Sequence, residues 1–226
     1  MSKTLRIAKI AILALLVVLL LVVAGVWYAI KQKPAWYVAA VEKEADSPEN
    51  RKAGREMELG IAHVISGFEK SGRWEAVFTE EQINGYLAAV INKKHPDLIP
   101  SEFKNPRVKI ESDGITVAAR LESPVETVIS LKADVYLARP GTIALRIRYI
   151  HAGNLPWSPG RLTEEITAAA QRNEIPIQWT QSEQDPVAML TIVSSKENKT
   201  TEITACQLED GKLYLSGITK PSKKRQ

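Results

Sequence analysis

The chain has 226 residues, a net charge of +4 and a single cysteine, Cys206. One cysteine excludes an intramolecular disulfide, a redox pair and a thiolate metal cluster, so the fold has to be stabilised by burial of apolar side chains. Five of the 30 basic residues flank one apolar run, which leaves 25 basic against 26 acidic residues elsewhere. Because a nucleic-acid-binding body needs a basic face, this balance argues against a nucleic-acid partner.

The apolar run extends from Ile10 to Ile30 and contains 21 residues without a charge. As a helix that rises about 1.5 Å per residue, it would be about 30 Å long, the thickness of the hydrocarbon core of a bilayer. A helix at the surface of a soluble domain would show a polar face, and this run has none. We therefore expect residues 1–33 to form a cytoplasmic stub and a single-pass transmembrane signal-anchor.

A cleaved signal peptide is the competing interpretation of the same run. The run is longer than the about 7–15 apolar residues of a signal peptide, and no clean A-x-A-like cleavage site follows it. The nearest small-residue candidate, Val23-Ala24-Gly25, lies inside the run. The sequence therefore favours an anchor that is retained.

Basic residues around the run predict its orientation. Three precede it and two follow it: Lys3, Arg6 and Lys9, then Lys31 and Lys33. The positive-inside rule places the N-terminus in the cytoplasm, although the two lysines on the far side weaken the asymmetry. We expect the C-terminal domain to be extracytoplasmic.

Three amphipathic helices are predicted after a connector over residues 31–47. Ser47-Pro48 places an N-cap and a first-turn proline before a helix that ends near Gly72. Thr79-Glu80-Glu81-Gln82 is a capping box for a second helix, which ends near His95-Pro96. Ser158-Pro159 begins the third.

From about residue 107 the apolar side chains recur every second residue, which is typical of half-buried strands. Asp113-Gly114 and Pro140-Gly141 separate strands that form an antiparallel meander, with Arg146 and Arg148 on its polar face. Val187–Val193 is more apolar and indicates a central strand, and Asp210-Gly211 marks a final hairpin. The predicted class is α+β: an N-terminal transmembrane helix, then one domain with a curved antiparallel sheet packed on two or three amphipathic helices.

The predicted domain boundaries follow from these elements. Residues 34–74 are the connector and first amphipathic helix, residues 75–219 the α+β domain, and residues 220–226 a basic tail. No Walker loop, G-x-S-x-G or G-x-G-x-x-G motif occurs in the chain.

The chain offers few residues for catalysis. Its three histidines fall on three different predicted elements and lack the short spacing of metal ligands. The pairs Glu80-Glu81 and Glu164-Glu165 lie in first helical turns, where acids complement the helix dipole. Cys206 is interpreted as a small buried apolar residue. We predict no catalytic residue, no metal and no cofactor, and hence a protein that is not an enzyme.

The most distinctive local sequence is Gly153-Asn154-Leu155-Pro156-Trp157, which joins the meander to the third helix. Trp157 either staples the start of that helix or contacts a ligand, and the structural role is the favoured interpretation.

Four runs carry a family resemblance: Phe78-Thr79-Glu80-Glu81-Gln82-Ile83-Asn84, Gly153-Asn154-Leu155-Pro156, Asp185-Pro186-Val187-Ala188 and Leu208-Glu209-Asp210-Gly211-Lys212-Leu213-Tyr214-Leu215-Ser216-Gly217. Together they resemble a family of uncharacterised single-pass bacterial membrane proteins, over most of residues 75–219. The order of elements, by topology only, is similar to that of tubular lipid-binding (TULIP-like) domains. That likeness implies a strongly curved sheet around helices with a long apolar groove for acyl chains.

An amphipathic helix pair on a curved sheet leaves an elongated apolar space if the helices do not fill it. The candidate lining residues come from both predicted helices and from the meander: Leu87, Val90, Ile91, Ile129, Leu131, Ile143, Leu145, Ile147, Leu162 and Ile166. The alternative is that all ten are core. The first functional hypothesis is a lipid-binding or hydrophobe-binding domain with membrane lipid as its partner. The second is a non-catalytic envelope scaffold or protein-interaction domain.

Overall fold

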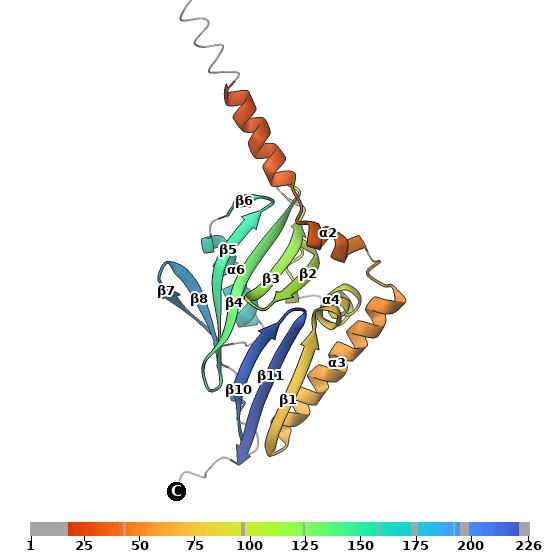
Figure 1. Ribbon diagram of the computed structural model, residues 1–226, viewed down its shortest axis with the longest axis vertical. Helices are drawn as coiled ribbons and strands as arrows, with labels where there is room; N and C mark the ends of the chain where they lie inside the picture. Colours follow the sequence, from red (N-terminus) through yellow and green to blue (C-terminus); the bar gives the residue numbers. More distant parts are fainter. Residues whose placement is uncertain are drawn as a thin grey trace, which may run out of the picture.

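Two antiparallel sheets and a set of helices form the α+β fold (Figure 1). The computed structural model describes residues 18–42, 44–95, 98–123, 125–157, 159–172, 176–191, 193–194 and 199–221. Its helices are Val18–Lys31, α2 (Ala35–Glu42), α3 (Pro48–Glu69), α4 (Glu80–Ala89), α5 (Ile91–Lys94) and α6 (Pro159–Arg172). Its strands are β1 (Gly72–Thr79), β2 (Phe103–Glu111), β3 (Gly114–Leu121), β4 (Thr127–Arg139), β5 (Thr142–Ala152), β6 (Leu155–Pro156), β7 (Ile177–Ser182), β8 (Asp185–Thr191), β9 (Val193–Ser194), β10 (Lys199–Glu209) and β11 (Lys212–Pro221).

The larger sheet has the strand order β2-β3-β4-β5-β8-β7, with the short β6 paired to β5. It contains the predicted meander, and β8 lies between β5 and β7 as its apolar sequence predicts. The predicted turns at Asp113-Gly114 and Pro140-Gly141 join its strands. The antiparallel meander is therefore confirmed.

The prediction of one sheet is wrong, because β1, β11, β10 and β9 form a second, four-stranded sheet. Strand β1 pairs with β11 along its whole length, from Gly72 to Thr79. Its alternating Trp74, Ala76 and Phe78 are buried, but the run is short and ends in a helix cap, so it was not predicted as a strand. A core cluster around Trp74, Ile143 and Ile203 joins the two sheets. The predicted domain boundary at residue 75 falls within β1.

Helix starts follow their capping sequences. Ser47 Oγ accepts a hydrogen bond from the backbone N–H of Asn50 at 3.2 Å, and Pro48 occupies the first turn of α3. Thr79 and Gln82 form both hydrogen bonds of the capping box, at 3.2 and 3.1 Å. The two predicted caps are confirmed, while Ser158 lies outside the described residues.

The first residues of α4 bind the free edge of β2 and so connect the two sheets. Asn84 forms a pair of 2.8 Å hydrogen bonds with the backbone N–H and C=O of Val108. Glu80 accepts a 2.8 Å bond from the N–H of Ile110, while its own N–H donates to the carbonyl of Gly211. These side chains satisfy an edge strand that would otherwise offer unpaired backbone groups. Glu80 therefore has a structural role.

Replacing Asn84 with alanine is expected to lower the free energy of unfolding by about 2–4 kcal/mol, because it leaves both backbone groups of Val108 without their partner. Chemical denaturation of the full chain measures the change. The matched comparison is Thr79→Ala, which removes a helix cap and is expected to cost about 1 kcal/mol. A smaller loss at Asn84 than at Thr79 would contradict this role.

The connector predicted over residues 31–47 contains a helix, α2, which the sequence analysis missed. Tyr37 is 3% exposed and packs with Ala118 and Val128 of the larger sheet. Its hydroxyl donates to the carbonyl of Asn105 at 3.0 Å. With only eight residues and no polar face, α2 lacks the periodicity that would distinguish it from a linker.

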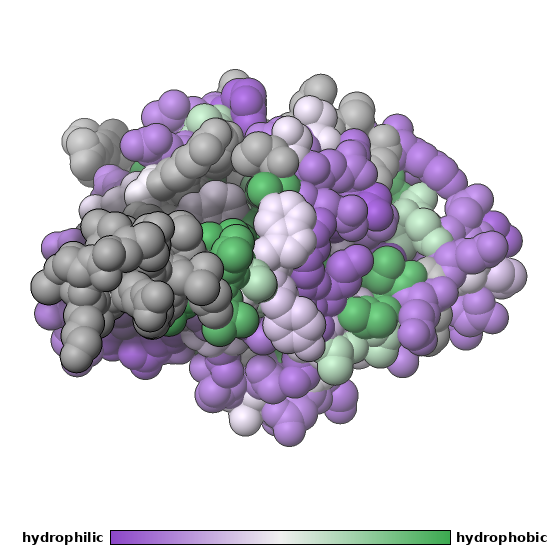
Figure 2. All heavy atoms as spheres, turned by 90° about the horizontal axis from the view of Figure 1, so that it is seen from above, coloured by the Kyte–Doolittle hydropathy of each residue, from purple (hydrophilic) through white to green (hydrophobic). Residues whose placement is uncertain are grey.

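Among the described residues, no single helix is long and apolar enough to cross a membrane. Two consecutive helices, Val18–Lys31 and α2, together meet this test by length and composition but are bent by 44° at the break between them. Residues 10–17 of the predicted span lie outside the described residues. The described helix projects from the body and exposes its apolar side chains (Figure 1). Seen from above, the coloured part of this face is mostly hydrophilic, with hydrophobic side chains in separate patches on either side of a pale central strip (Figure 2).

Candidate functional site

An apolar cavity of about 510 Å³ lies against the larger sheet and is partly open to solvent. It is bounded by strands β3, β4, β5, β7 and β8, by α6, which crosses behind β4 in Figure 1, and by the segment 98–106. Among the residues that the structure describes, all those that line it are apolar: Leu98, Ile99, Pro100, Phe103, Pro106, Val117, Ala118, Ala119, Ile129, Leu131, Ala133, Leu145, Ile147, Ile166, Ala170, Ile177, Trp179, Ala188 and Leu190. Its volume falls within the about 300–1,000 Å³ typical of ligand sites.

Strand pairing brings these side chains to one face. Val117 lies opposite Leu131, and Leu145 lies opposite Ala188, so the two-residue alternation of each strand places its apolar residues on the same side. The indole of Trp179 supplies the one polar side-chain atom of the lining, and its N–H donates to Thr167 Oγ1 of α6 at 2.7 Å. The lining side chains that the structure describes therefore offer a ligand no free hydrogen-bonding group or charge.

Five of the ten predicted lining residues surround this cavity: Ile129, Leu131, Leu145, Ile147 and Ile166. Ile143 is buried instead in the cluster that joins the two sheets. Leu87 lies on α4, Ile91 on α5, and Val90 between the two helices, where it packs over Gly54 of α3. None of the three lines the cavity. The Leu162 side chain lies outside the described part of the chain.

The sequence analysis missed the segment 98–106 and Trp179 as parts of the lining. Leu98-Ile99-Pro100 follows the predicted helix end at His95-Pro96, and three consecutive apolar residues beside Phe103 are a signal for burial. Trp179 lies on β7, where apolar and polar residues alternate. Its side chain lines the cavity because α6 packs over it. Sequence alternation alone does not show which face a following helix will cover.

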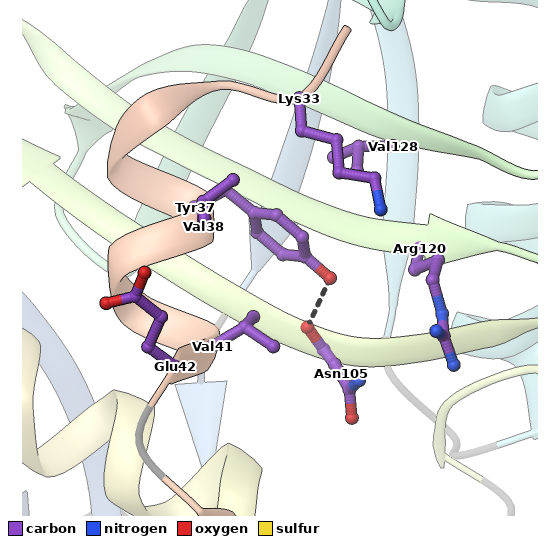
Figure 3. Close-up of a pocket in the computed structure, with 8 residues that line it drawn as sticks. All are labelled: Lys33, Tyr37, Val38, Val41, Glu42, Asn105, Arg120 and Val128. Atoms are coloured by element: carbon purple, nitrogen blue, oxygen red, sulfur yellow. Dashed lines mark hydrogen bonds between the residues drawn. The ribbon is translucent and has the colours of Figure 1, made fainter. Parts of the chain in front are cut away.

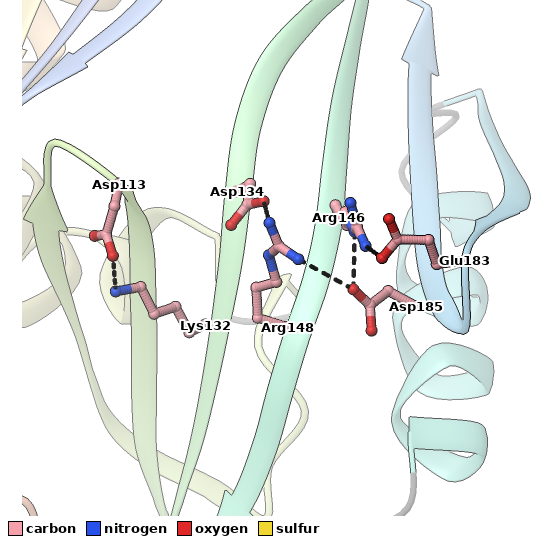
Figure 4. A network of polar contacts seen from close by, with 7 residues as sticks. All are labelled: Asp113, Lys132, Asp134, Arg146, Arg148, Glu183 and Asp185. Atoms are coloured by element: carbon pink, nitrogen blue, oxygen red, sulfur yellow. Dashed lines mark hydrogen bonds and ion pairs between the residues drawn. The ribbon is translucent and has the colours of Figure 1, made fainter.

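The opposite face of the larger sheet carries a network of ion pairs (Figure 4). Arg148 binds Asp134 at 2.6 Å and Asp185 at 3.4 Å, while Arg146 binds Asp185 at 2.8 Å and Glu183 at 2.6 Å. Arg146 and Arg148 thus lie on the polar face of the larger sheet, as the sequence predicts. The Asp185-Pro186 run contributes to this network through Asp185.

The run Gly153-Asn154 holds the end of the helix Val18–Lys31. The N–H of Asn154 donates to the Ala29 carbonyl at 3.0 Å, and Thr127 Oγ1 donates to the Ile30 carbonyl at 2.7 Å. Gly153 has a φ of +59°, and a Cβ there would clash with the carbonyl oxygens of both Ala29 and Ile30. The carbonyls at this helix end are therefore satisfied by the body of the protein, which fixes the helix to one end of the larger sheet.

The Trp157 side chain packs against the core cluster of Leu121, Ile129, Ile147 and Ile150, and its backbone N–H donates to the Ile150 carbonyl at 2.8 Å. Two members of that cluster, Ile129 and Ile147, also line the cavity. Trp157 therefore supports the wall of the cavity.

Cys206 lies beside the core cluster that joins the sheets, and burial raises the pKa of its thiol. Because only the thiolate reacts rapidly with iodoacetamide, we expect slow alkylation of the native chain near pH 8 and at least a tenfold faster reaction after unfolding. Mass spectrometry of the alkylated chain measures both rates. Equal rates would show that the thiol is open to solvent.

Within the described ranges, no group of three His, Cys, Asp or Glu side chains is arranged to hold a metal ion. The predicted absence of catalytic residues, metal and cofactor stays a prediction. Comparisons with models of known protein families, with curated proteins and with solved structures gave no match. The resemblances drawn from the four runs and from the topology therefore also stay predictions.

Proposed function

We propose that this protein is a membrane-anchored, non-catalytic domain that holds a lipid or another hydrophobic ligand in the cavity beneath α6. The observation that carries the proposal is the composition of the cavity of about 510 Å³, whose lining residues in the described part of the chain are all apolar. An apolar space of this size without a free polar group suits a hydrocarbon chain, because burying each methylene there is favourable by about 0.8 kcal/mol.

The helix Val18–Lys31 supports a membrane location for this activity. Its apolar side chains are exposed, with Leu20 68% and Leu21 67% exposed, which is costly in water and favourable in a bilayer. The proposed arrangement has the N-terminus in the cytoplasm and the folded domain outside it. A TULIP-like mode of binding, with the acyl chain under the sheet, is the form of the proposal that the topology suggests.

Photo-crosslinking of the full chain with a diazirine-bearing fatty acid tests the proposal. Digestion and peptide mass spectrometry are expected to find adducts on the cavity segments 129–147 and 166–190, besides adducts on the exposed helix 18–31. Adducts confined to residues 18–31 would overturn the proposal, because they would report contact with bulk lipid only. A scaffold without a ligand, the second hypothesis, would give that result.

A further inference from the structure

A second, smaller pocket of about 210 Å³ lies where the projecting helix meets the body (Figure 3). It lies between α2 and the β2–β4 part of the larger sheet, and its lining includes Lys33, Tyr37, Asn105, Arg120 and Val128. Lys33 is two residues beyond the end of the helix Val18–Lys31. Val128 follows Thr127, whose hydroxyl binds the Ile30 carbonyl. The pocket is therefore fixed directly beside the proposed membrane anchor.

Cationic groups gather around this pocket. Figure 3 shows the side chains of Lys33 and Arg120 on the same side of it, with the Tyr37 hydroxyl between them and α2. A third cation, Arg107, is 2% exposed and donates to the carbonyls of Ala40 and Pro106 at 3.0 and 2.8 Å. Burial raises the pKa of the Tyr37 hydroxyl, and the charges of Arg107 and Arg120 act in the opposite direction, so both guanidinium groups influence this spot.

Three acidic side chains lie nearby, and two of them pair with cations of the pocket. Glu122 binds Arg120 at 3.0 Å and Glu126 binds Lys33 at 3.7 Å, both as partly exposed pairs. Glu42 lines the pocket, but its carboxylate lies on the far side of α2 from Lys33 and Arg120 in Figure 3. Among the described residues, Arg107 has no carboxylate partner and the buried Arg120 Nε has no hydrogen-bond partner. A buried donor without a partner is costly and is commonly met by a ligand or water.

We propose that this pocket binds the phosphate of an anionic lipid headgroup, with Arg120 and Lys33 as its ligands. The proposal rests on the membrane placement of the helix Val18–Lys31 in the proposed function, and not on occupancy of the apolar cavity. A guanidinium group matches the geometry of a phosphate, and the lysine adds a second charge at the level of the membrane surface.

Native mass spectrometry of the full chain in detergent tests the site with phosphatidylglycerol and phosphatidylcholine of identical acyl chains. The wild-type chain is expected to retain phosphatidylglycerol about tenfold more strongly, since each basic residue near an anionic headgroup contributes measurably to binding. The double variant Arg120→Gln, Lys33→Gln is expected to lose this preference. The control Lys52→Gln, Arg55→Gln removes the same charge from the exposed face of α3 and is expected to keep it.

Glu122→Gln provides a variant that leaves both cations in place. It frees Arg120 from its partner and is expected to increase the preference for phosphatidylglycerol two- to threefold. Equal retention of the two lipids by the wild type, or equal losses in the site variant and the α3 control, would overturn the proposal. Displacement of phosphatidylglycerol by 10 mM inorganic phosphate would overturn the assignment to a headgroup and point to free phosphate. Crosslinks in the apolar cavity report separately on the proposed function.

Discussion

Replacing Ala119 with phenylalanine is expected to weaken retention of a fatty acid in the apolar cavity by about 100-fold. Ala119 lies on β3 opposite Ile129, and its side chain lines the cavity. A phenyl ring there occupies the space of about three to four methylenes, each worth about 0.8 kcal/mol of binding free energy, and about 3 kcal/mol corresponds to a 100-fold change. The yield of photo-crosslinks on segments 129–147 and 166–190 measures the loss.

The fold is expected to tolerate this substitution. The new ring enters open space instead of a packed core, so the free energy of unfolding should stay the same or rise by about 0.5–2 kcal/mol. Crosslinks on the exposed helix 18–31 should be unchanged, because they do not depend on the cavity. These two measurements distinguish weaker ligand binding from unfolding of the protein.

Val77→Phe is the matched control. Val77 lies on β1, is 46% exposed and belongs to the smaller sheet, away from the cavity lining. The same gain in side-chain size there should leave the cavity crosslinks at the wild-type level. If Ala119→Phe also left them at that level, the fatty acid would have to bind elsewhere and the proposed function would be wrong.

Local sequence signals predicted most of the secondary structure because they act within a few residues. The capping box at Thr79 and the turn at Asp113-Gly114 depend only on neighbouring backbone groups, and both are present in the structure. The alternation of apolar residues in the meander likewise placed Leu131 and Ile147 on the inner face of the sheet. Predictions of this kind need no knowledge of distant contacts.

The division into two sheets and the exact lining of the cavity depend on contacts between distant parts of the chain. Strand β1 is stabilised by β11, whose residues lie more than 130 positions later in the sequence. Leu87, Val90 and Ile91 have the helical apolar pattern that the prediction used, but Val90 packs against α3 at Gly54 and none of the three reaches the cavity. Periodicity shows that a face is buried, and it does not show which partner buries it.

The four runs that carry the family resemblance mostly build connections in the fold. Asn84 and Gly211 act at the junction of the two sheets, Asp185 acts in the ion-pair network, and Asn154 binds the helix end. Of the residues in these runs, Ala188 lines the cavity. The distinctive sequence motifs are thus structural in this chain, and the candidate site is made of ordinary apolar residues.

Gly153→Ala is expected to release the helix Val18–Lys31 from its fixed orientation on the sheet. The left-handed backbone at this position costs alanine about 1–2 kcal/mol. Its new methyl group would also push against the carbonyls of Ala29 and Ile30, which Asn154 and Thr127 now bind. Moving the helix away relieves the clash but breaks both hydrogen bonds.

Distances between spin labels on Val23 and Thr180, in a chain whose Cys206 is replaced by alanine, measure the effect in lipid nanodiscs. The wild-type chain should give one narrow distribution, and Gly153→Ala a clearly broader one. Gly211→Ala is the control, because Gly211 also has a positive φ, +75°, but has open space where the methyl group would lie. Gly211→Ala should lower the free energy of unfolding by a similar amount and keep the narrow distribution of distances.

A broad distribution in the wild type would contradict a fixed junction, and equal broadening in both variants would assign the effect to general loss of stability. A narrow wild-type distribution that broadens only at Gly153 would mean that the helix and the larger sheet act as one rigid unit. The pocket at Lys33 and Arg120 would then stay at a constant height above the membrane. Under that condition a headgroup could reach Arg120 without any movement of the domain, so Gly153→Ala should also reduce the preference for phosphatidylglycerol.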